Sequence, residues 1–205
     1  MSAPLDHSET ARPGADCPIL HNLESYWQSL RHATHLPARS AIAPNRIDAA
    51  LPYAFILQRV APGVARMRVA GQHIHDLLRM DARGMPVSIL FAPDSRDRLC
   101  DLVETAFTQP AIVAASLISP AQTFRPALTG TILLLPMRDD RGQISRVLGA
   151  LVTAEPTGHL PRRFDMAKVP VRIDNLAITL ASSGTAPMRK PDAARPALRL
   201  IVNNA

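Results

Sequence analysis

The chain has 205 residues, which is enough for one domain of ordinary size with flanking segments. Hydrophobic residues make up 47% of it and aromatic residues only 4%, so we expect an aliphatic core and no aromatic platform for nucleic-acid bases. The formal net charge is +6, from 23 Lys plus Arg against 17 Asp plus Glu, but the basic residues are spread along the whole chain. This dispersal argues against nucleic acid as a partner.

The cysteines and the apolar stretches bear on the compartment. Cys17 and Cys100 lie far apart in dissimilar contexts and form no metal-binding or redox motif. The first residues lack the basic and apolar regions of a secretory signal. The longest apolar stretches, such as residues 132–137, are far shorter than the roughly 20 residues of a membrane helix. We therefore expect a cytoplasmic protein without a membrane segment.

The N-terminal part predicts a leader followed by a helix. Residues 1–18 contain prolines and small polar residues without periodicity, which is typical of a mobile leader. In residues 19–31 the apolar side chains recur at three- and four-residue spacing, which predicts an amphipathic helix. Its apolar face includes Tyr26, Trp27 and Leu30. We expect the helix to bury this face on its own sheet or on a neighbouring molecule.

The next segment predicts a hairpin and then helices. Residues 53–60 form an apolar run bounded by prolines, and residues 66–69 alternate, which places Met67 and Val69 inside. Short helices are expected within residues 73–80. Asp94-Ser95 can cap a longer helix over residues 96–108, whose apolar stripe is the clearest helical pattern in the chain.

Three further strands are predicted at residues 111–118, 130–137 and 145–153, the last two joined by a polar, glycine-containing turn. With the earlier hairpin they give an α+β fold: a five-stranded antiparallel sheet with helices on one face and an N-terminal amphipathic helix. The domain is expected to span residues 19–155. Frequent prolines then predict a C-terminal extension over residues 156–205 that is partly ordered, with a short strand at residues 198–202.

Four short stretches in the first half of the chain carry a family resemblance: residues 26–31 (Tyr-Trp-Gln-Ser-Leu-Arg), residues 36–40 (Leu-Pro-Ala-Arg-Ser), Ile47 with Leu51-Pro52 and Phe55, and residues 66–71. With the element order, they make residues 20–153 resemble a bacterial branch of the PAS fold, a family of short single-domain PAS-like proteins. The chain departs from that pattern at residues 78–81. The resemblance implies a sensory or interaction role in signalling and brings no catalytic residues.

Chemically active residues do not form a recognisable site in the sequence. His73 and His75 flank Ile74 and could ligate a metal or haem, but no neighbouring cluster completes a ligand set, so we interpret them as polar residues opening a short helix. Asp139-Asp140 is interpreted as solvated turn chemistry. The sequence contains neither a nucleophile elbow nor a phosphate-binding glycine loop. We therefore predict no enzyme activity, no metal site and no resident cofactor.

A cavity between the sheet and its helices is the remaining candidate site, and ligand sites normally add a few polar groups to an apolar lining. The same apolar residues describe a filled core equally well, and the shortage of polar residues among them favours the filled core. The expected lining residues are Phe55, Met67, Val69, Leu78, Phe91, Phe107, Leu117 and Leu133.

Arg39, in the Leu-Pro-Ala-Arg-Ser stretch, is the one charged residue that stands out. A guanidinium fixed beside a turn can bind backbone carbonyls or a carboxylate. Two roles stay open for it: a structural tie between the N-terminal segment and the sheet, or recognition of a partner.

The leading hypothesis is a non-catalytic PAS-like regulatory module that acts through protein contacts, with homodimer formation as its simplest expression. The expected interaction residues are Tyr26, Trp27, Leu30 and Arg39. The alternative is a sensor that holds haem, flavin or a metabolite in the pocket. An arginine-rich nucleic-acid binder is a third and disfavoured hypothesis.

Overall fold

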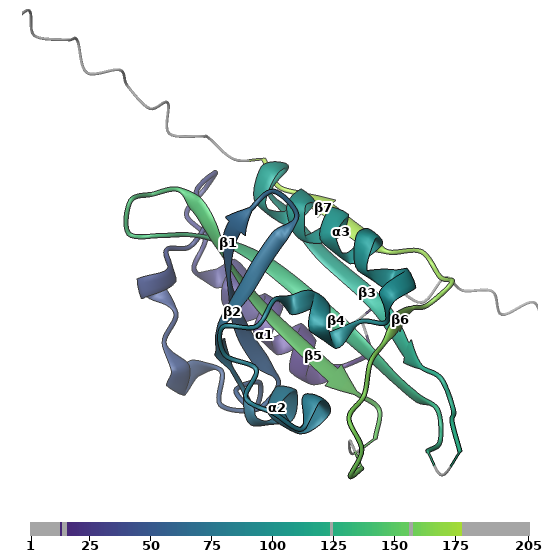
Figure 1. Ribbon diagram of the computed structural model, residues 1–205. Coiled ribbons are helices and arrows are strands. Elements are labelled where there is room, and N and C mark those ends of the chain that lie inside the picture. The colour runs from purple at the N-terminus through teal and green to yellow at the C-terminus, as the bar shows by residue number, and fades with distance from the viewer. Residues whose placement is uncertain (1–12, 14–15, 124, 156–157, 178–205) are drawn as a thin grey trace, which may run out of the picture.

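An antiparallel sheet covered by helices organises the described part of the chain (Figure 1). The computed structural model describes residue 13 and residues 16–123, 125–155 and 158–177. The helices within these residues are α1 (Pro18–Ser29), α2 (Gln72–Leu78), α3 (Arg96–Thr108) and the 3-10 turns η1 (Arg39–Ala41), η2 (Pro44–Arg46), η3 (Val87–Leu90) and η4 (Pro93–Ser95). The strands are β1 (Ala54–Ala61), β2 (Val64–Ala70), β3 (Ala111–Ser119), β4 (Leu128–Arg138), β5 (Ile144–Thr153), β6 (Asp165–Met166) and β7 (Arg172–Asn175).

The strands follow the order β2-β1-β5-β4-β3-β6, and β7 also pairs with β3. Every pairing between these strands is antiparallel. The five strands from β1 to β5 and the N-terminal helix α1 confirm the α+β prediction. Residues 1–12 and 14–15 of the predicted leader, and residues 178–205 with the predicted terminal strand, lie outside the described residues.

The two last strands come from the segment predicted as a C-terminal extension and lie along the outer edge of β3. β6 pairs with Leu117 and Ile118, and β7 pairs with β3 over residues 111–114. The Arg172 guanidinium on β7 also donates two hydrogen bonds to the Glu24 carboxylate on α1, at 2.8 and 2.6 Å. These bonds raise the pKa of Arg172 above its ordinary value. The extension is thereby joined to both the sheet and α1.

The helices α2 and α3 cover one face of the sheet and form the predicted helical layer (Figure 1). The residues expected to form the apolar stripe of α3 are all buried, as the 3.6-residue period requires. The Glu104 carboxylate of α3 pairs with the Arg59 guanidinium and accepts a hydrogen bond from the Gly63 backbone N–H at 2.9 Å. This contact fixes the β1–β2 hairpin against α3.

The helix α1 lies on the opposite face of the sheet and encloses a second hydrophobic cluster. Its side chains Leu20, Leu23 and Trp27 are buried there, in the cluster that contains Leu135 of β4 and Leu148 of β5. The helix therefore buries its apolar face on its own sheet, the first of the two possibilities that its pattern allowed. Among the described residues, no helix combines the length and the apolar character needed to cross a membrane.

Val69 does not lie inside, contrary to the prediction. Its side chain is 47% exposed, whereas Met67 is fully buried. The reason is an irregularity in strand pairing: Ile56 pairs with Val69 and Leu57 with Met67, so Arg68 is an extra residue in β2. The extra residue moves Val69 to the face that carries Ile56, away from α2 and α3.

Leu133 is buried, but on the face covered by α1 rather than in the layer under α2 and α3. Its neighbours Ile132 and Leu134 occupy the α3 side. Because both faces of β4 are covered, residues 132–137 are apolar throughout and the sequence carries no alternation to reveal which residues face which helix.

Candidate functional site

The interior between the sheet and α2 and α3 was the first candidate site. Its buried hydrophobic residues form a single cluster. The sequence predicted eight lining residues, of which Val69 and Leu133 lie elsewhere. The other six are at most 8% exposed and lie together in this cluster: Phe55, Met67, Leu78, Phe91, Phe107 and Leu117.

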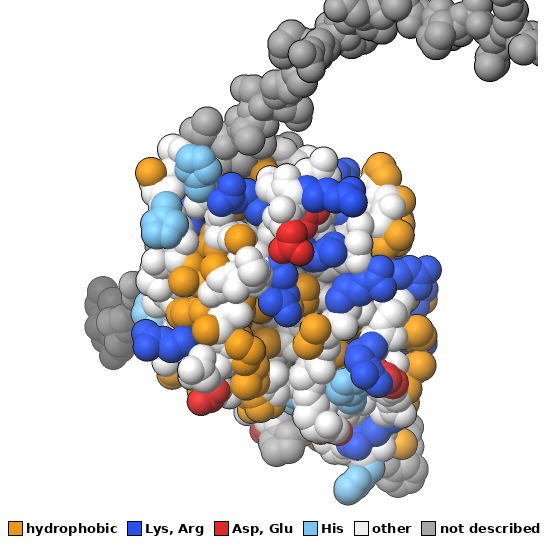
Figure 2. All heavy atoms as spheres, turned by 90° about the vertical axis from the view of Figure 1, so that its left-hand side faces the viewer, with side chains coloured by type: hydrophobic (Ala, Val, Ile, Leu, Met, Phe, Trp, Pro, Cys, Tyr) orange, Lys and Arg blue, Asp and Glu red, His pale blue; other side chains and the backbone are white. Residues whose placement is uncertain are grey.

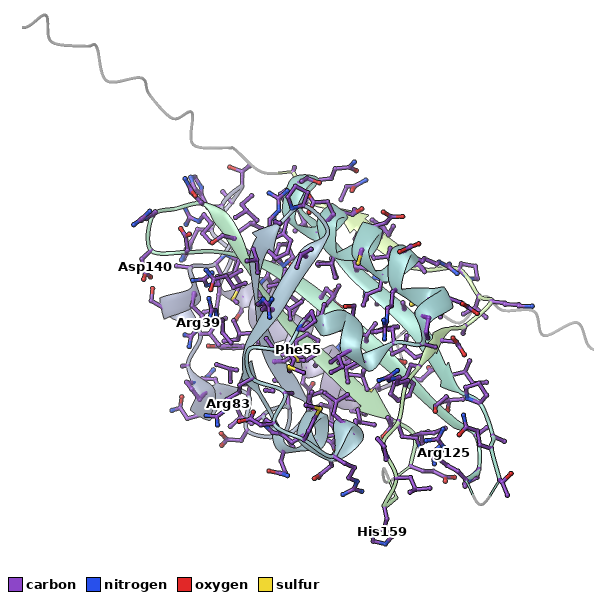
Figure 3. The ribbon with its side chains drawn as sticks, in the orientation of Figure 1. Arg39, Phe55, Arg83, Arg125, Asp140 and His159 are labelled. Atoms are coloured by element: carbon purple, nitrogen blue, oxygen red, sulfur yellow. The ribbon has the colours of Figure 1, made fainter. Side chains whose placement is uncertain are left out.

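Phe55 occupies the centre of this interior (Figure 3). It pairs with Gly149 across β1 and β5, and its ring lies directly over that glycine. A Cβ atom built on Gly149 would be 2.1 Å from Cε2 of the ring, so only glycine leaves room for this packing. A small cavity of about 50 Å³ lies at the other end of the hairpin, between the β1–β2 turn, η3 and α3. It is far below the roughly 300–1,000 Å³ of ordinary ligand pockets.

The predicted interaction residues of α1 are turned partly or fully inward. Trp27 is 0% exposed, and Leu30 and Tyr26 are half-buried. The Tyr26 hydroxyl accepts a hydrogen bond from the Ala43 backbone N–H at 2.9 Å and donates one to the Ala41 carbonyl at 3.4 Å. These contacts attach the 3-10 segment to α1.

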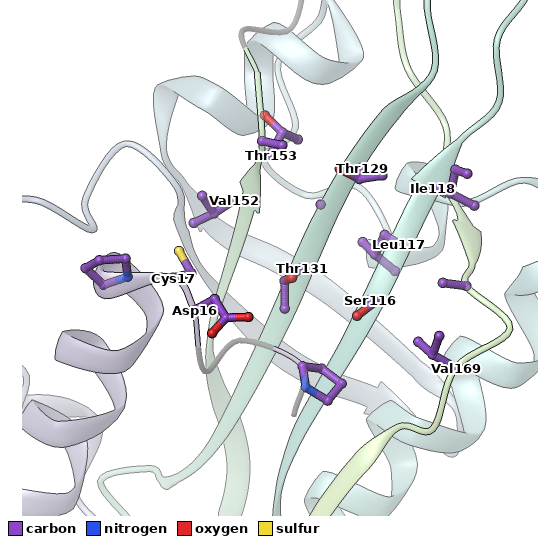
Figure 4. A pocket seen from close by; sticks show the side chains of 15 residues that line it. Asp16, Cys17, Ser116, Leu117, Ile118, Thr129, Thr131, Val152, Thr153 and Val169 are labelled. Atoms are coloured by element: carbon purple, nitrogen blue, oxygen red, sulfur yellow. The ribbon is translucent and has the colours of Figure 1, made fainter. Parts of the chain in front are cut away.

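A groove of about 570 Å³ lies on the α1 side of the sheet, where β3, β4 and β5 extend past the start of the helix (Figure 4). Its wall is formed by short side chains, among them Ser116, Thr131 and Val152, and by Asp16 and Cys17 before α1. Residues 14–15, which adjoin it in the chain, lie outside the described residues.

The second groove, which we call the arginine groove, has a volume of about 410 Å³. It opens beside the β4–β5 hairpin, on the face of β1 and β2 that points away from α2 and α3. Figure 2 shows basic side chains gathered on this side of the molecule around a small acidic group, next to hydrophobic side chains. Figure 3 shows Arg39 and Asp140 on this side of the structure. The lining residues are Arg39, Ser40, Ile56, Gln58, Arg68, Val69, Asp140 and Arg146.

Strand register brings two of the three arginines together. Gln58 of β1 pairs with Arg146 of β5, so both side chains lie on one face of the sheet. The Gln58 side-chain oxygen accepts a hydrogen bond from Nε of Arg68, the extra residue in β2. The Arg146 guanidinium donates to the Ser145 carbonyl at 3.4 Å. The groove is thus assembled from β1, β2 and β5, which are adjacent in the sheet.

Arg39 reaches the groove because Arg138 holds its segment against the sheet. The Arg138 side chain donates through Nε to the Leu36 carbonyl at 2.9 Å, and the Arg138 backbone N–H donates to the Pro37 carbonyl at 2.9 Å. The structural tie considered for Arg39 is therefore made by Arg138. Among the described residues, the Arg39 guanidinium has no hydrogen-bond or ion-pair partner.

Asp139 shapes the hairpin that borders the groove. Its carboxylate accepts hydrogen bonds from the Ser145 hydroxyl at 2.6 Å and from the backbone N–H groups of Gln143 at 3.0 Å and Arg141 at 2.9 Å. The bond from Ser145, followed by the two backbone bonds, lowers the pKa of Asp139. The neighbouring Asp140 makes none of these bonds and lines the groove as its one carboxylate.

Replacing Asp139 with asparagine is expected to destabilise the protein at neutral pH and to matter little in acid. The folded-state pKa of Asp139 lies below its unfolded value of about 3.9, so its carboxylate stabilises the fold above that value. This contribution is lost as the pH falls through the folded-state pKa. Thermal unfolding of Asp139→Asn and of the control Asp140→Asn, measured from neutral pH down to below the folded-state pKa of Asp139, checks the prediction. A loss of stability in Asp139→Asn that stays the same at acidic pH would contradict the prediction.

Metal-ligating side chains do not converge in the described part of the chain: it contains no group of three or more His, Cys, Asp or Glu placed to hold an ion. The His73 ring contacts the Tyr53 ring in a tilted arrangement, with 4.8 Å between ring centroids, and burial lowers the pKa of His73. His75 accepts the Ala82 backbone N–H at Nδ1 at 3.0 Å, and its Nε2 lies 3.1 Å from the Ala70 carbonyl. Both rings are thus engaged in local contacts at α2.

A family model described as "PAS domain" matches residues 16–152, which span α1, α2, α3, β1 to β4 and nearly all of β5. The chain belongs to the PAS domain family. PAS domains are in general sensory modules rather than enzymes, which supports a signalling role for this chain. The strands β6 and β7 lie beyond the matched residues. The comparison with curated proteins gives no match.

Several solved structures are similar to this PAS domain at low identity. A light-oxygen-voltage domain studied with a flavin analogue is 14% identical, with 54% of this chain and 83% of that chain covered and a TM-score of 0.42. The light state of the blue-light photoreceptor Aureochrome1 LOV is 16% identical, with 56% and 90% covered and a TM-score of 0.40. An RNA-binding light-oxygen-voltage receptor is 18% identical, with 58% and 36% covered and a TM-score of 0.38. With these scores they support no conclusion about ligands of this chain.

Proposed function

We propose that this PAS domain is a non-catalytic regulatory module that acts through contacts with protein partners, with homodimer formation as the simplest case. The observation that carries the proposal is the contrast between its interior and its surface. The interior residues pack in one apolar cluster with the Phe55 ring over Gly149, whereas the arginine groove is open and polar. A signal is therefore transmitted through surface contacts.

Exposed apolar side chains support partner binding on the same side of the sheet. Val60 and Val64 flank the β1–β2 turn and are 56% and 42% exposed, and Val69 continues the series along β2. Large apolar side chains on a surface gain free energy when a partner covers them. A cytoplasmic setting belongs to the same proposal and is supported by the two free thiols, Cys17 and Cys100.

Native mass spectrometry of the purified full chain tests the proposal, together with its absorption spectrum. We expect the mass of two polypeptide chains with no ligand bound, and no absorbance from a bound chromophore. A haem, flavin or metabolite present in stoichiometric amount would overturn the proposal and support a sensor with a ligand in its interior. A monomer without ligand at micromolar concentration would contradict the homodimer.

A further inference from the structure

The arginine groove presents more positive charge than its own residues neutralise. Three guanidinium groups, from Arg39, Arg68 and Arg146, line it together with a single carboxylate, Asp140. The hydrogen bonds of Arg68 and Arg146 go to neutral groups, the Gln58 amide oxygen and the Ser145 carbonyl. Arg146 also lies close enough to the Asp139 carboxylate to help lower the pKa of that group. None of the three pairs with a carboxylate among the described residues. Three guanidinium groups thus face the carboxylates of Asp140 and the neighbouring Asp139, which leaves an excess of positive charge in the groove.

The apolar residues of the groove restrict which anionic ligands fit it. Ile56, which is nearly buried, and the half-exposed Val69 lie next to the guanidinium groups. A ligand that fits both parts carries an acidic group close to an aliphatic one. Acidic side chains interspersed with aliphatic ones in a peptide have this chemistry, and a planar guanidinium can bind a carboxylate through two parallel hydrogen bonds.

Nucleic acid fits the groove less well. Binding of single strands relies on aromatic side chains that stack on bases, and the lining includes no aromatic residue. The Asp140 carboxylate would also repel a continuous row of phosphates. A peptide can direct its carboxylates toward the arginines and leave Asp140 facing solvent.

We propose that the arginine groove binds an acidic, aliphatic-containing segment of a partner protein, with Arg39 and Arg146 as the main contacts for its carboxylates. This inference rests on the proposed function and adds the chemistry of the partner. Arg39 and Arg146 are half-buried, so their charges are less screened than that of the exposed Arg68. Asp140 acts against the acidic segment and limits how many carboxylates the groove accepts.

Fluorescence anisotropy with labelled peptides tests the proposal on the full chain. The probe repeats the tripeptide Glu-Leu-Glu, and the matched control peptide repeats Gln-Leu-Gln. We expect the acidic peptide to bind and the amide peptide to bind at least about tenfold more weakly, because several charge-assisted pairs are lost. Added salt is expected to lower the affinity for the acidic peptide more than the affinity for the amide peptide.

Variants locate the binding in the groove. The double variant Arg39→Gln and Arg146→Gln is expected to lower affinity about tenfold. The control double variant Arg79→Gln and Arg98→Gln removes the same charge from exposed positions outside the groove and is expected to leave affinity nearly unchanged. Asp140→Asn should tighten binding by about two- to fivefold, since it removes the one repulsive carboxylate. Circular dichroism establishes that each variant is folded, and Arg68→Gln, at an exposed position of the groove, replaces the double variant if that one does not fold.

Three results would overturn the proposal: absence of peptide binding, equal binding of the acidic and amide peptides, or an equal loss in the control double variant. Competition by duplex DNA that depends on Arg39 and Arg146 would also overturn it and assign the groove to phosphates. The proposed function fails on a different observation, a stoichiometric ligand in native mass spectra. A partner whose binding is insensitive to the groove variants would contradict the role of the groove and leave the proposed regulatory function standing.

Discussion

Truncation of Phe55 to alanine is expected to lower the free energy of unfolding by about 3–5 kcal/mol, because it removes a fully buried ring from the centre of the core. The loss falls at the high end of this range because Gly149 offers no side chain to fill the space. Urea unfolding followed through the single tryptophan, Trp27, measures it. Val60→Ala, at an exposed position of the same strand, is the control and is expected to change stability by no more than about 0.5 kcal/mol.

The same variant tests whether the interior is a filled core. Phe55→Ala should create an apolar cavity that binds a small apolar molecule such as benzene, and binding to the native state raises the melting temperature. The wild-type protein should show no such rise. An equal rise in the wild type would indicate an existing cavity and would favour the sensor with an internal ligand. A loss of stability below about 1 kcal/mol in Phe55→Ala would contradict tight packing around the ring.

Truncation of Trp27 to alanine is expected to cost about 3–5 kcal/mol, because its buried indole holds α1 against the outer face of the sheet. Trp27→Phe should cost less. The buried indole Nε1 has no hydrogen-bond partner among the described residues, so replacing it with a carbon ring removes an unsatisfied donor. Denaturation followed by circular dichroism measures both changes, since the fluorescent reporter is lost.

The exposed neighbour Ser25→Ala provides the control on the same helix and should be nearly neutral. Costs close to zero for both tryptophan variants would mean that α1 does not pack on its own sheet in solution. Its apolar face would then be available to a second molecule, as the alternative reading of the helix pattern allowed.

The positions of the helices and strands could be predicted closely because their apolar residues recur with clear spacing. The helix expected over residues 96–108 coincides with α3, and the strands at residues 111–118 and 145–153 differ from β3 and β5 by one residue at one end. The faces of the strands were harder to assign. Leu133 lies in an apolar run covered on both sides, and Val69 follows an extra residue that changes the phase of β2. Neither effect leaves a mark on the sequence pattern.

Only part of the arginine groove could be recognised in the sequence. Arg39 stands out because a guanidinium fixed beside a turn can bind carbonyls or a carboxylate, but Arg68 and Arg146 join it through strand register. Gln58 meets Arg146 only once β1 pairs with β5, and Arg68 reaches Gln58 only because β2 contains the extra residue. Alternation in residues 66–69 did place the Arg68 side chain outside. That signal marks an exposed arginine without showing what lies next to it.

The pairing of β6 and β7 with β3 bears on the solubility of the protein. An open strand edge offers unpaired N–H and C=O groups to any other chain, and this is a common start of aggregation. At the other end of the sheet, residues 84–86 shield part of β2: the Met67 N–H donates to the Met85 carbonyl at 2.9 Å and the Gly84 N–H to the Met67 carbonyl at 2.7 Å. The short strands of residues 165–175 shield the β3 side in the same way. Part of β2 is thus covered by a local segment of the chain, and on the β3 side the outermost edge is reduced to the short strands β6 and β7, which offer few unpaired backbone groups to another chain.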